Sequence, residues 1–526
     1  MSLPQMLYSD GIRKAQTVTF GGYDHTAGAQ DGAIYDMENM SGELYPVLSP
    51  RRPRWNVRDI PSPNGICAHD GLFWVSGTGF YAGGVLKGTV TDGEKRFASL
   101  GAYIVILPDK KYYNRLTDEF GALEVSWSGP VKIQDGSYAG EKAGANTIYA
   151  AGADFSGTFK KGDAVTISGC TVHPENNRSL IIREIDGGYL RFYENSFTIN
   201  AGGDSETLTV KREVPDMDFI CENENRLWGC KGDEIYASKL GDIFNWNVFD
   251  GVSTDSYAVS VGSSGDFTGA CSYLGYPCFF KEEHIYKVYG DRPSNFQVMG
   301  SASLGVMKGA SRSLAIAGET LFYLSRIGIV GYAGGIPQTI SLNFGTQRFR
   351  NGTAGSDGRR YYVSMQDGDG KWSLFVYDTQ LKLWHREDAT QAAGFCYEGG
   401  LYCLTKPGKL WLAGGANDVP PEAVREESVS AMAEFADFVE SNPNRKGTSK
   451  LQVRLELGED ARVKIEMMFD SDGVWREVRT LETARKRSFY LPIIPRRSDH
   501  FRIRFTGRGE WRLHSLVRES YSGSEM

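Results

Sequence analysis

The sequence predicts an all-β protein. Glycine (63) and the aromatic residues Tyr (27), Phe (27) and Trp (10) are abundant, and short apolar stretches alternate with Gly- and Asp-rich turns. This composition favours short strands and tight turns over helices. At 526 residues the chain is too long for one ordinary hydrophobic core, so we expect about two to four domains.

A hairpin pattern recurs seven times. Each copy has a Gly or polar turn, a short apolar strand, a polar tip and a second strand. The copies begin at residues 70, 101, 224, 275, 318, 358 and 399, and the later ones are 40 to 51 residues apart. That spacing is typical of a four-stranded propeller blade. It predicts a seven-bladed β-propeller over 56–124 and 215–415, or a six-bladed one if the first two hairpins share a blade.

The segment 125–214 interrupts the hairpin series. Val165 with Ile167, and Leu208 with Val210, alternate with polar residues as half-buried strands do. We interpret this segment as a small β-barrel domain inserted into the propeller.

The two ends of the chain differ from the hairpin region. Residues 1–55 are expected to be an N-terminal arm whose strands close the propeller against its last copy. Residues 416–428 are rich in Pro and charge, as linkers are, and 429–526 alternate as an antiparallel β-sandwich does. Within that domain "VSAMAEFADFV" (429–439) fits either a helix or a strand, and the β character of its surroundings favours a strand.

Charge and hydropathy exclude several classes of protein. The net charge of −7 argues against a sequence-specific nucleic-acid binder, which needs a basic surface. No apolar run is long enough to span a membrane, and the first residues lack the pattern of a secretory signal. The eight cysteines show no C-x-x-C spacing, so we expect reduced thiols in a protein made in the cytoplasm.

Motifs that carry chemistry are missing from the sequence. It has no phosphate-binding P-loop, no H-E-x-x-H zinc motif and no G-x-S-x-G elbow. "VGSSGDFTGA" (261–270) is interpreted as a loop between sheets, and "DGDG" (367–370) and "DSDG" (470–473) as turns, since neither is followed by the Glu that completes a calcium loop. We therefore expect no enzyme, no catalytic residue, no metal and no cofactor.

The stretch "FFKEEHIYKVYGD" (279–291) tests this interpretation, because a His beside two carboxylates suggests a catalytic or metal site. Lys281, Glu282, Glu283 and His284 fall at the tip of one of the seven hairpins. A tip that varies among seven copies of one turn is typical of structure, so we expect this stretch to be a structural copy, with His284 a solvated tip residue.

Several phrases resemble the β-propeller virion proteins of tailed bacteriophages. They are "KLGDIFNWNVFDG", "FFKEEHIYKVYGDRPSNFQV", "GIVGYAGGIPQTIS" and the ending "LPIIPRRSDHFRIRFTGRGEWRLHSLVRESYSGSE". The domain order is similar in kind to that of tail nozzle, hub and stabilisation proteins. The resemblance implies a non-enzymatic structural protein of the neck, collar or tail, made in the bacterial host cytoplasm and assembled in the virion as a ring-forming or adaptor platform.

The expected partners are other virion proteins, namely portal or connector, tail or collar subunits, and further copies of the same chain. The most basic stretch lies in the C-terminal domain, where Arg496 and Arg497 precede a predicted strand. Arginine suits bidentate pairing across interfaces, so we expect these two residues to contact an acidic face of a neighbouring subunit.

The alternative function is a propeller that binds or cleaves carbohydrate at the host surface. Aromatic residues beside a carboxylate pair would favour this alternative.

Overall fold

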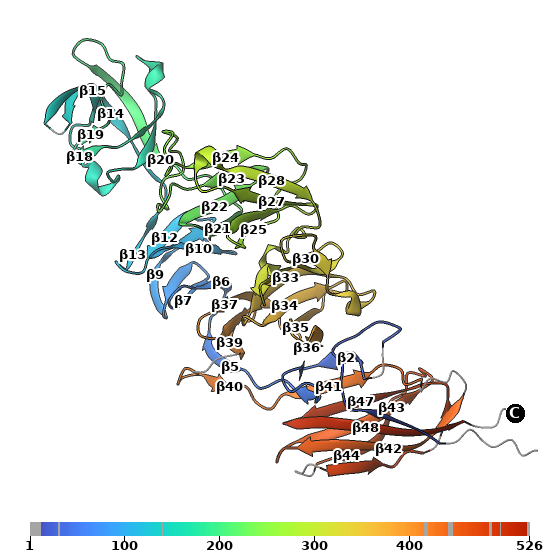
Figure 1. Ribbon diagram of the computed structural model, residues 1–526. Coiled ribbons are helices and arrows are strands. Elements are labelled where there is room, and N and C mark those ends of the chain that lie inside the picture. The colour runs from blue at the N-terminus through green and yellow to red at the C-terminus, as the bar shows by residue number, and fades with distance from the viewer. Residues whose placement is uncertain are drawn as a thin grey trace, which may run out of the picture. The chain divides into compact units, whose positions relative to one another are not determined.

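The computed structural model describes residues 12–29, 32–138, 140–414, 419–439, 445–482, 487–494 and 496–522 (Figure 1). Within these residues the chain consists of β-strands and five short 3-10 turns, with no α-helix. The all-β prediction is confirmed. No helix that could span a membrane is present in the described part. The chain divides into two compact units, Asn64–Ser311 and Met1–Pro63 with Arg312–Met526.

The seven predicted hairpins are the central strands of seven separate antiparallel sheets. The first two hairpins lie in different sheets. Four of these sheets belong mainly to the Asn64–Ser311 unit: β6–β9 (Pro63–Ala68, Leu72–Ser76, Gly79–Ala82, Val85–Thr89), β10–β13 (Arg96–Leu100, Tyr103–Leu107, Lys111–Asn114, Glu119–Ala122), β21–β24 (Phe219–Asn223, Arg226–Lys231, Glu234–Ala237, Tyr257–Ser260) and β25–β28 (Gly269–Tyr273, Tyr276–Phe280, His284–Tyr289, Gln297–Ala302).

The other three sheets belong to the second unit (Figure 1). They are β29–β32 (Ala315–Ala317, Thr320–Ser325, Gly328–Tyr332, Gln338–Thr339), β33–β36 (Phe349–Ser356, Arg360–Asp367, Trp372–Asp378, Leu383–Arg386), and a sheet that begins with β37–β39 (Ala392–Tyr397, Leu401–Thr405, Lys409–Gly414). Within each unit, the first strands of successive sheets lie beside one another: β10, β21 and β25 in one, and β29, β33 and β37 in the other.

Neighbouring sheets share apolar cores. Between the β21–β24 and β25–β28 sheets, one buried cluster contains Trp228, Ile235, Phe267 and Phe279. The chain turns between β25 and β26 through Leu274 and Gly275. Both residues have positive φ, which fits a tight two-residue loop between two strands. The turn residues thus set how neighbouring strands pair, and the apolar face of each sheet packs against the neighbouring sheet.

The inserted segment forms a single seven-stranded sheet with its own core. Its order is β17-β16-β20-β14-β15-β19-β18, so β17 and β18 are its edges. The strands are β14 (Val125–Tyr138), β15 (Glu141–Tyr149), β16 (Ala164–Ser168), β17 (Ser179–Ile181), β18 (Glu184–Asp186), β19 (Tyr189–Arg191) and β20 (Asp204–Arg212). Asn245 joins this sheet to the propeller-type sheets of the same unit, because its Oδ1 accepts from the Ala164 N–H at 2.7 Å.

The seventh propeller-type sheet is completed by a strand from the N-terminal side of the chain. Beyond β39, its order continues with β5 (Trp55–Asp59) and β40 (Val424–Arg425). The Asp59 carboxylate accepts from Lys409 Nζ at 2.8 Å across β5 and β39. The completing strand thus lies at the predicted boundary of the arm, and part of the predicted linker pairs with it.

The C-terminal domain is a sandwich of two antiparallel sheets. One contains β1 (Arg13–Thr17), β48 (Trp511–Ser522), β42 (Lys446–Leu457), β45 (Arg487–Leu491) and the short β46 (Arg497–Ser498); the other contains β2 (Ile34–Glu38), β41 (Ser430–Phe435), β47 (Phe501–Arg508), β43 (Arg462–Phe469) and β44 (Arg476–Leu481). The strand prediction for the ambiguous 429–439 segment is confirmed by β41.

The sandwich includes two strands of the N-terminal arm. β1 pairs with β48 and β2 pairs with β41, so the prediction that the arm strands 13–17 and 34–38 close the propeller is wrong. The physical reason is burial. Ile34 and Met37 are fully buried, and Thr17 Oγ1 accepts from the buried Arg518 guanidinium at 2.8 Å. These side chains gain more from the sandwich core than a half-exposed edge position would offer.

Candidate functional site

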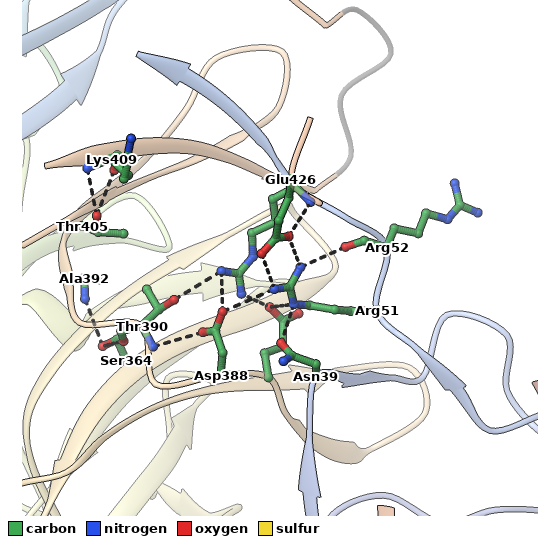
Figure 2. A network of polar contacts seen from close by, with 12 residues as sticks. Asn39, Arg51, Arg52, Ser364, Asp388, Thr390, Ala392, Thr405, Lys409 and Glu426 are labelled. Carbon is green, nitrogen blue, oxygen red and sulfur yellow. Dashed lines mark hydrogen bonds and ion pairs between the residues drawn. The ribbon is translucent and has the colours of Figure 1, made fainter. Parts of the chain in front are cut away.

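The most highly organised charged cluster lies where the N-terminal segment meets the last propeller-type sheets. We call this cluster the arginine joint; it consists of Arg51, Arg54, Glu387, Asp388 and Glu426. Figure 2 labels Arg51, Asp388 and Glu426 among its side chains. Arg51 and Arg54 come from the segment before β5, Glu387 and Asp388 follow β36, and Glu426 follows β40. Three distant parts of the chain therefore meet at one set of ion pairs.

Arg51 makes the joint's bidentate contact. Its two terminal nitrogens donate to the two Glu426 carboxylate oxygens at 2.7 and 2.9 Å, and its Nε donates to Asn39 Oδ1 at 2.8 Å. The Arg51 side chain is only 6% exposed. Bidentate pairing satisfies both partners of a buried pair, which offsets the cost of removing their charges from water.

Arg54 binds the other two carboxylates. It donates to Asp388 Oδ2 at 2.9 Å and to Thr390 Oγ1 at 3.2 Å, and it also forms an ion pair with Glu387. Burial by itself would lower the pKa of Arg54, but the charges of Glu387 and Asp388 raise it above its ordinary value. Arg54 therefore stays protonated.

The acidic partners show the converse balance. Burial would raise the pKa values of Asp388 and Glu426, yet both are held below their ordinary values. The charge of Arg54 is the main opposing cause at Asp388, and the hydrogen bond from Arg51 is the main one at Glu426. The charged groups of the joint thus pair with one another, which is typical of a structural contact.

A second feature is a cavity of about 550 Å³ in the Asn64–Ser311 unit, which we call the Lys281 cavity. It brings together two stretches that the sequence analysis treated separately, the Gly/Ser-rich loop 261–270 and the hairpin tip at 281–284. Asp218 and Lys308 also line it. No sequence signal placed these segments together, because the contact joins a loop between sheets to the tip of the next hairpin.

Lys281, in the hairpin tip, is only 2% exposed. Its Nζ donates to the Ser263 carbonyl at 2.8 Å and lies 5.1 Å from the centre of the Phe267 ring. Burial lowers the pKa of Lys281. Ser263, in the loop that covers this lysine, lies 18 residues earlier in the sequence, so the hairpin pattern alone gave no sign of its burial.

The rest of the hairpin tip lies nearer the surface. Glu282 and Glu283 are exposed, whereas His284, which was expected to be solvated, is half-buried at the start of β27. A Glu282 carboxylate oxygen accepts from the Lys308 N–H at 3.0 Å, which ties the tip to the loop after β28.

The two acidic turns are held by their own hydrogen bonds. In "DGDG", Asp367 Oδ1 accepts from the backbone N–H groups of Asp369 and Lys371 at 2.9 Å each. In "DSDG", Asp470 lies near Asp499 and His500, with one ligand-type atom of each within 4.8 Å of the others. Asp470 accepts a hydrogen bond from the Asp499 N–H at 2.9 Å, and the Asp499 carboxylate lies 2.6 Å from His500 Nδ1. These groups are therefore partners of one another.

Arg496 and Arg497, the predicted partner contacts, both lie exposed on the sandwich. Arg496 is 3.7 Å from Asp472 and 5.4 Å from the centre of the Phe469 ring, and Arg497 begins β46. In β47, the expected alternation is present: Phe501, Ile503 and Phe505 are buried, whereas the arginines between them are half-buried.

Two arginines of β47, Arg502 and Arg504, pair with carboxylates of the same domain. Arg502 pairs with Glu434 at 3.1 Å and Asp437 at 2.6 Å, and Arg504 pairs with Glu466 at 2.9 Å. Of the basic stretch noted in the sequence, Arg485 and Lys486 fall outside the described residues. Arg487, Arg496 and Arg497 of that stretch are exposed.

Comparisons with known proteins add little. No protein-family model matches the sequence, and no curated protein matches it. Among solved structures, the exo-β-1,3-galactanase of Phanerochaete chrysosporium is similar over 57% of this chain and 94% of its own, with 9% identity and a TM-score of 0.22. Raptor of Chaetomium thermophilum is similar over 70% of this chain and 30% of its own, with 13% identity and a TM-score of 0.31. TM-scores this low carry no argument about this chain.

The arginine joint predicts a large effect of removing one partner. Arg54→Met should destabilise the second unit by about 3–5 kcal/mol, because Glu387 and Asp388 would be left without their main counter-charge. Urea unfolding followed by tryptophan fluorescence measures this effect. Lys409→Ala is the control, since the Lys409–Asp59 pair is exposed to water and its loss should leave the midpoint nearly unchanged. Equal midpoints for the two variants would contradict the assignment of the joint as a structural contact.

The same joint predicts a dependence on acid. Asp388 and Glu426 have lowered pKa values in the folded protein, so their stabilisation is present above the unfolded-state pKa values of about 3.9 and 4.3 and is lost as the pH falls through the folded values. The stability difference between the wild type and Arg54→Met should therefore be full at neutral pH and shrink below about pH 4. Urea unfolding across this range checks the trend, and a difference independent of pH would show that the ion pairs do not supply it.

Proposed function

We propose that this chain is a non-enzymatic structural protein of a tailed-phage virion, a neck, collar, nozzle or tail-hub component that acts as a ring-forming or adaptor platform. The proposal includes closure of the seven sheets into a seven-bladed β-propeller. Its partners are portal or connector, tail or collar subunits and further copies of the chain. It is made in the host cytoplasm and has no membrane or sequence-specific nucleic-acid partner.

The observation that carries the proposal is the interlocking of the two ends of the chain. The N-terminal segment supplies β1 and β2 to the sandwich and β5 to the seventh sheet. The arginine joint fixes this segment where it passes between them. A protein that bears load in a particle benefits from such threading, because neither end can be pulled free without breaking main-chain hydrogen bonds within sheets and buried ion pairs.

The resemblance of its strand-and-turn phrases to phage propeller proteins supports the same proposal. The non-enzymatic part is supported by the arginine joint, whose charged groups are paired with one another at bonding distance. The alternative, a propeller that binds or cleaves carbohydrate at the host surface, takes its support from the Lys281 cavity and not from the joint.

The proposal predicts that particles need this chain. In a phage carrying a nonsense mutation in the gene, particles should lack the protein and be incomplete, and wild-type protein supplied from a plasmid should restore them. Mass spectrometry and electron microscopy of gradient-purified particles measure both outcomes. Complete, infectious particles without the chain would contradict the proposal.

The same complementation tests the predicted partner contact. Arg496→Glu with Arg497→Glu should leave the protein folded and reduce its incorporation, because an acidic partner face would repel the new charges. Arg292→Glu with Arg350→Glu is the matched control, with the same charge change at exposed sites outside the sandwich. Equal incorporation of both double variants would show that Arg496 and Arg497 are merely solvated.

A further inference from the structure

One corner of the sandwich carries an exposed surface that has no acidic residue among its described positions. It consists of β45 and the loop that follows, residues 487–494 and 496–497, and we call it the basic ridge. β45 pairs only with β42 among the described strands, so it is an edge of its sheet. The large exposed side chains of the ridge are Arg487, Tyr490, Ile494, Arg496 and Arg497.

The basic ridge holds the most exposed large apolar side chain of the described residues. Ile494 is 87% exposed, and Tyr490 is 56% exposed. Val474 adds a third exposed apolar group, since it follows Asp472 on the tip between β43 and β44, and Asp472 lies 3.7 Å from Arg496. Burial of such side chains in a partner is favourable, and Tyr and Arg are enriched at the centres of protein interfaces. The ridge therefore has the composition of a docking surface.

The arginines of the ridge can bind further carboxylates. Arg496 is 3.7 Å from Asp472, which is too long for a hydrogen bond. Neither Arg487 nor Arg497 forms an ion pair within the described residues, and Arg487 lies 4.7 Å from the centre of the Phe489 ring. A guanidinium has five N–H donors and binds a carboxylate through two of them. The ridge thus has donors for carboxylates of another molecule.

The charge of the chain is distributed unevenly. Residues 429–526 contain 18 Lys and Arg against 15 Asp and Glu, and the arm strands β1 and β2 add two of each, so the sandwich has a net charge of +3. The Asn64–Ser311 unit contains 22 Lys and Arg against 31 Asp and Glu, a net charge of −9. An acidic partner for the ridge is therefore present on every copy of the protein.

We propose that the basic ridge of one copy docks on the Asn64–Ser311 unit of another copy of the same chain. The arginines pair with carboxylates of that unit, and Ile494 with Tyr490 forms the apolar centre from which water is excluded. A sandwich-to-sandwich contact would instead place the arginines of two copies against each other. Because the contact joins two different surfaces, its repetition builds a ring or a filament. The inference deepens the proposed ring-forming role and rests on that role for closure of the ring.

Sedimentation of the purified full-length protein tests the contact without particles. At a protein concentration of about 50 µM we expect oligomers in about 50 mM salt and their dissociation in about 500 mM salt, where exposed charges are screened. Arg496→Glu with Arg497→Glu should weaken association about tenfold or more, because like charges would face each other. Arg348→Glu with Arg350→Glu makes the same charge change at exposed positions outside the sandwich and should associate as the wild type does. A monomer at low salt, or equal association of the two double variants, would overturn the proposal.

A single substitution tests the apolar centre. Ile494→Ser should weaken association about tenfold, because it removes the apolar group that the contact buries. Ile336→Ser is the matched control, since Ile336 is 80% exposed and lies outside the sandwich, between β31 and β32. An equal effect of the two serine variants would show that Ile494 is not part of the contact.

Photo-cross-linking identifies the surface that the ridge meets. A benzophenone amino acid replaces Tyr490, and isotopically light and heavy copies are mixed so that mass spectrometry recognises cross-links between copies. We expect such cross-links to reach peptides of the Asn64–Ser311 unit, and cross-links confined to the sandwich would overturn the proposal. If the protein does not associate while particles still need the chain, this inference fails alone and the ridge meets a different virion subunit. Complete particles without the chain would contradict the proposed function whatever the sedimentation result.

Discussion

The architecture of the second unit depends on two arginines that hold the N-terminal segment to sheets formed hundreds of residues later. Arg54 and Glu387 are 333 positions apart in the sequence, and Arg51 and Glu426 are 375 apart. Each ion pair is buried enough that losing one partner leaves a charge without compensation. The joint therefore ties the segment before β5 to residues that follow β36 and β40.

This arrangement has a consequence for folding. The seventh sheet lacks a strand, and the sandwich lacks two, until the N-terminal segment has been threaded into place. Pairing across such sequence separations is slow, because the entropy of closing a long loop must be overcome before the contacts form. The Asn64–Ser311 unit is built mostly from local hairpins and the insert sheet, so it has no comparable dependence on the chain ends.

Structure that depends on contacts between residues close in the sequence was predictable, whereas structure that depends on distant contacts was not. The seven hairpins, such as that around Phe279, were predictable because turn residues and alternating side chains lie within a few positions of each other. The alternation of Phe501, Ile503 and Phe505 was readable for the same reason. β5 was missed because "WNVRD" is polar and partly exposed, and it becomes a strand only beside β39. The burial of Lys281 was missed because a loop from the neighbouring sheet covers it.

The central claim is a structural role in a phage particle, and single-particle electron cryomicroscopy of intact particles tests it most directly. The account predicts density for several symmetry-related copies, each with seven sheets closed in a ring, the 125–214 sheet outside that ring and the sandwich in contact with a neighbouring subunit. A complete map of the neck and tail with no density that fits this chain, or with its seven sheets in an open row, would contradict the account.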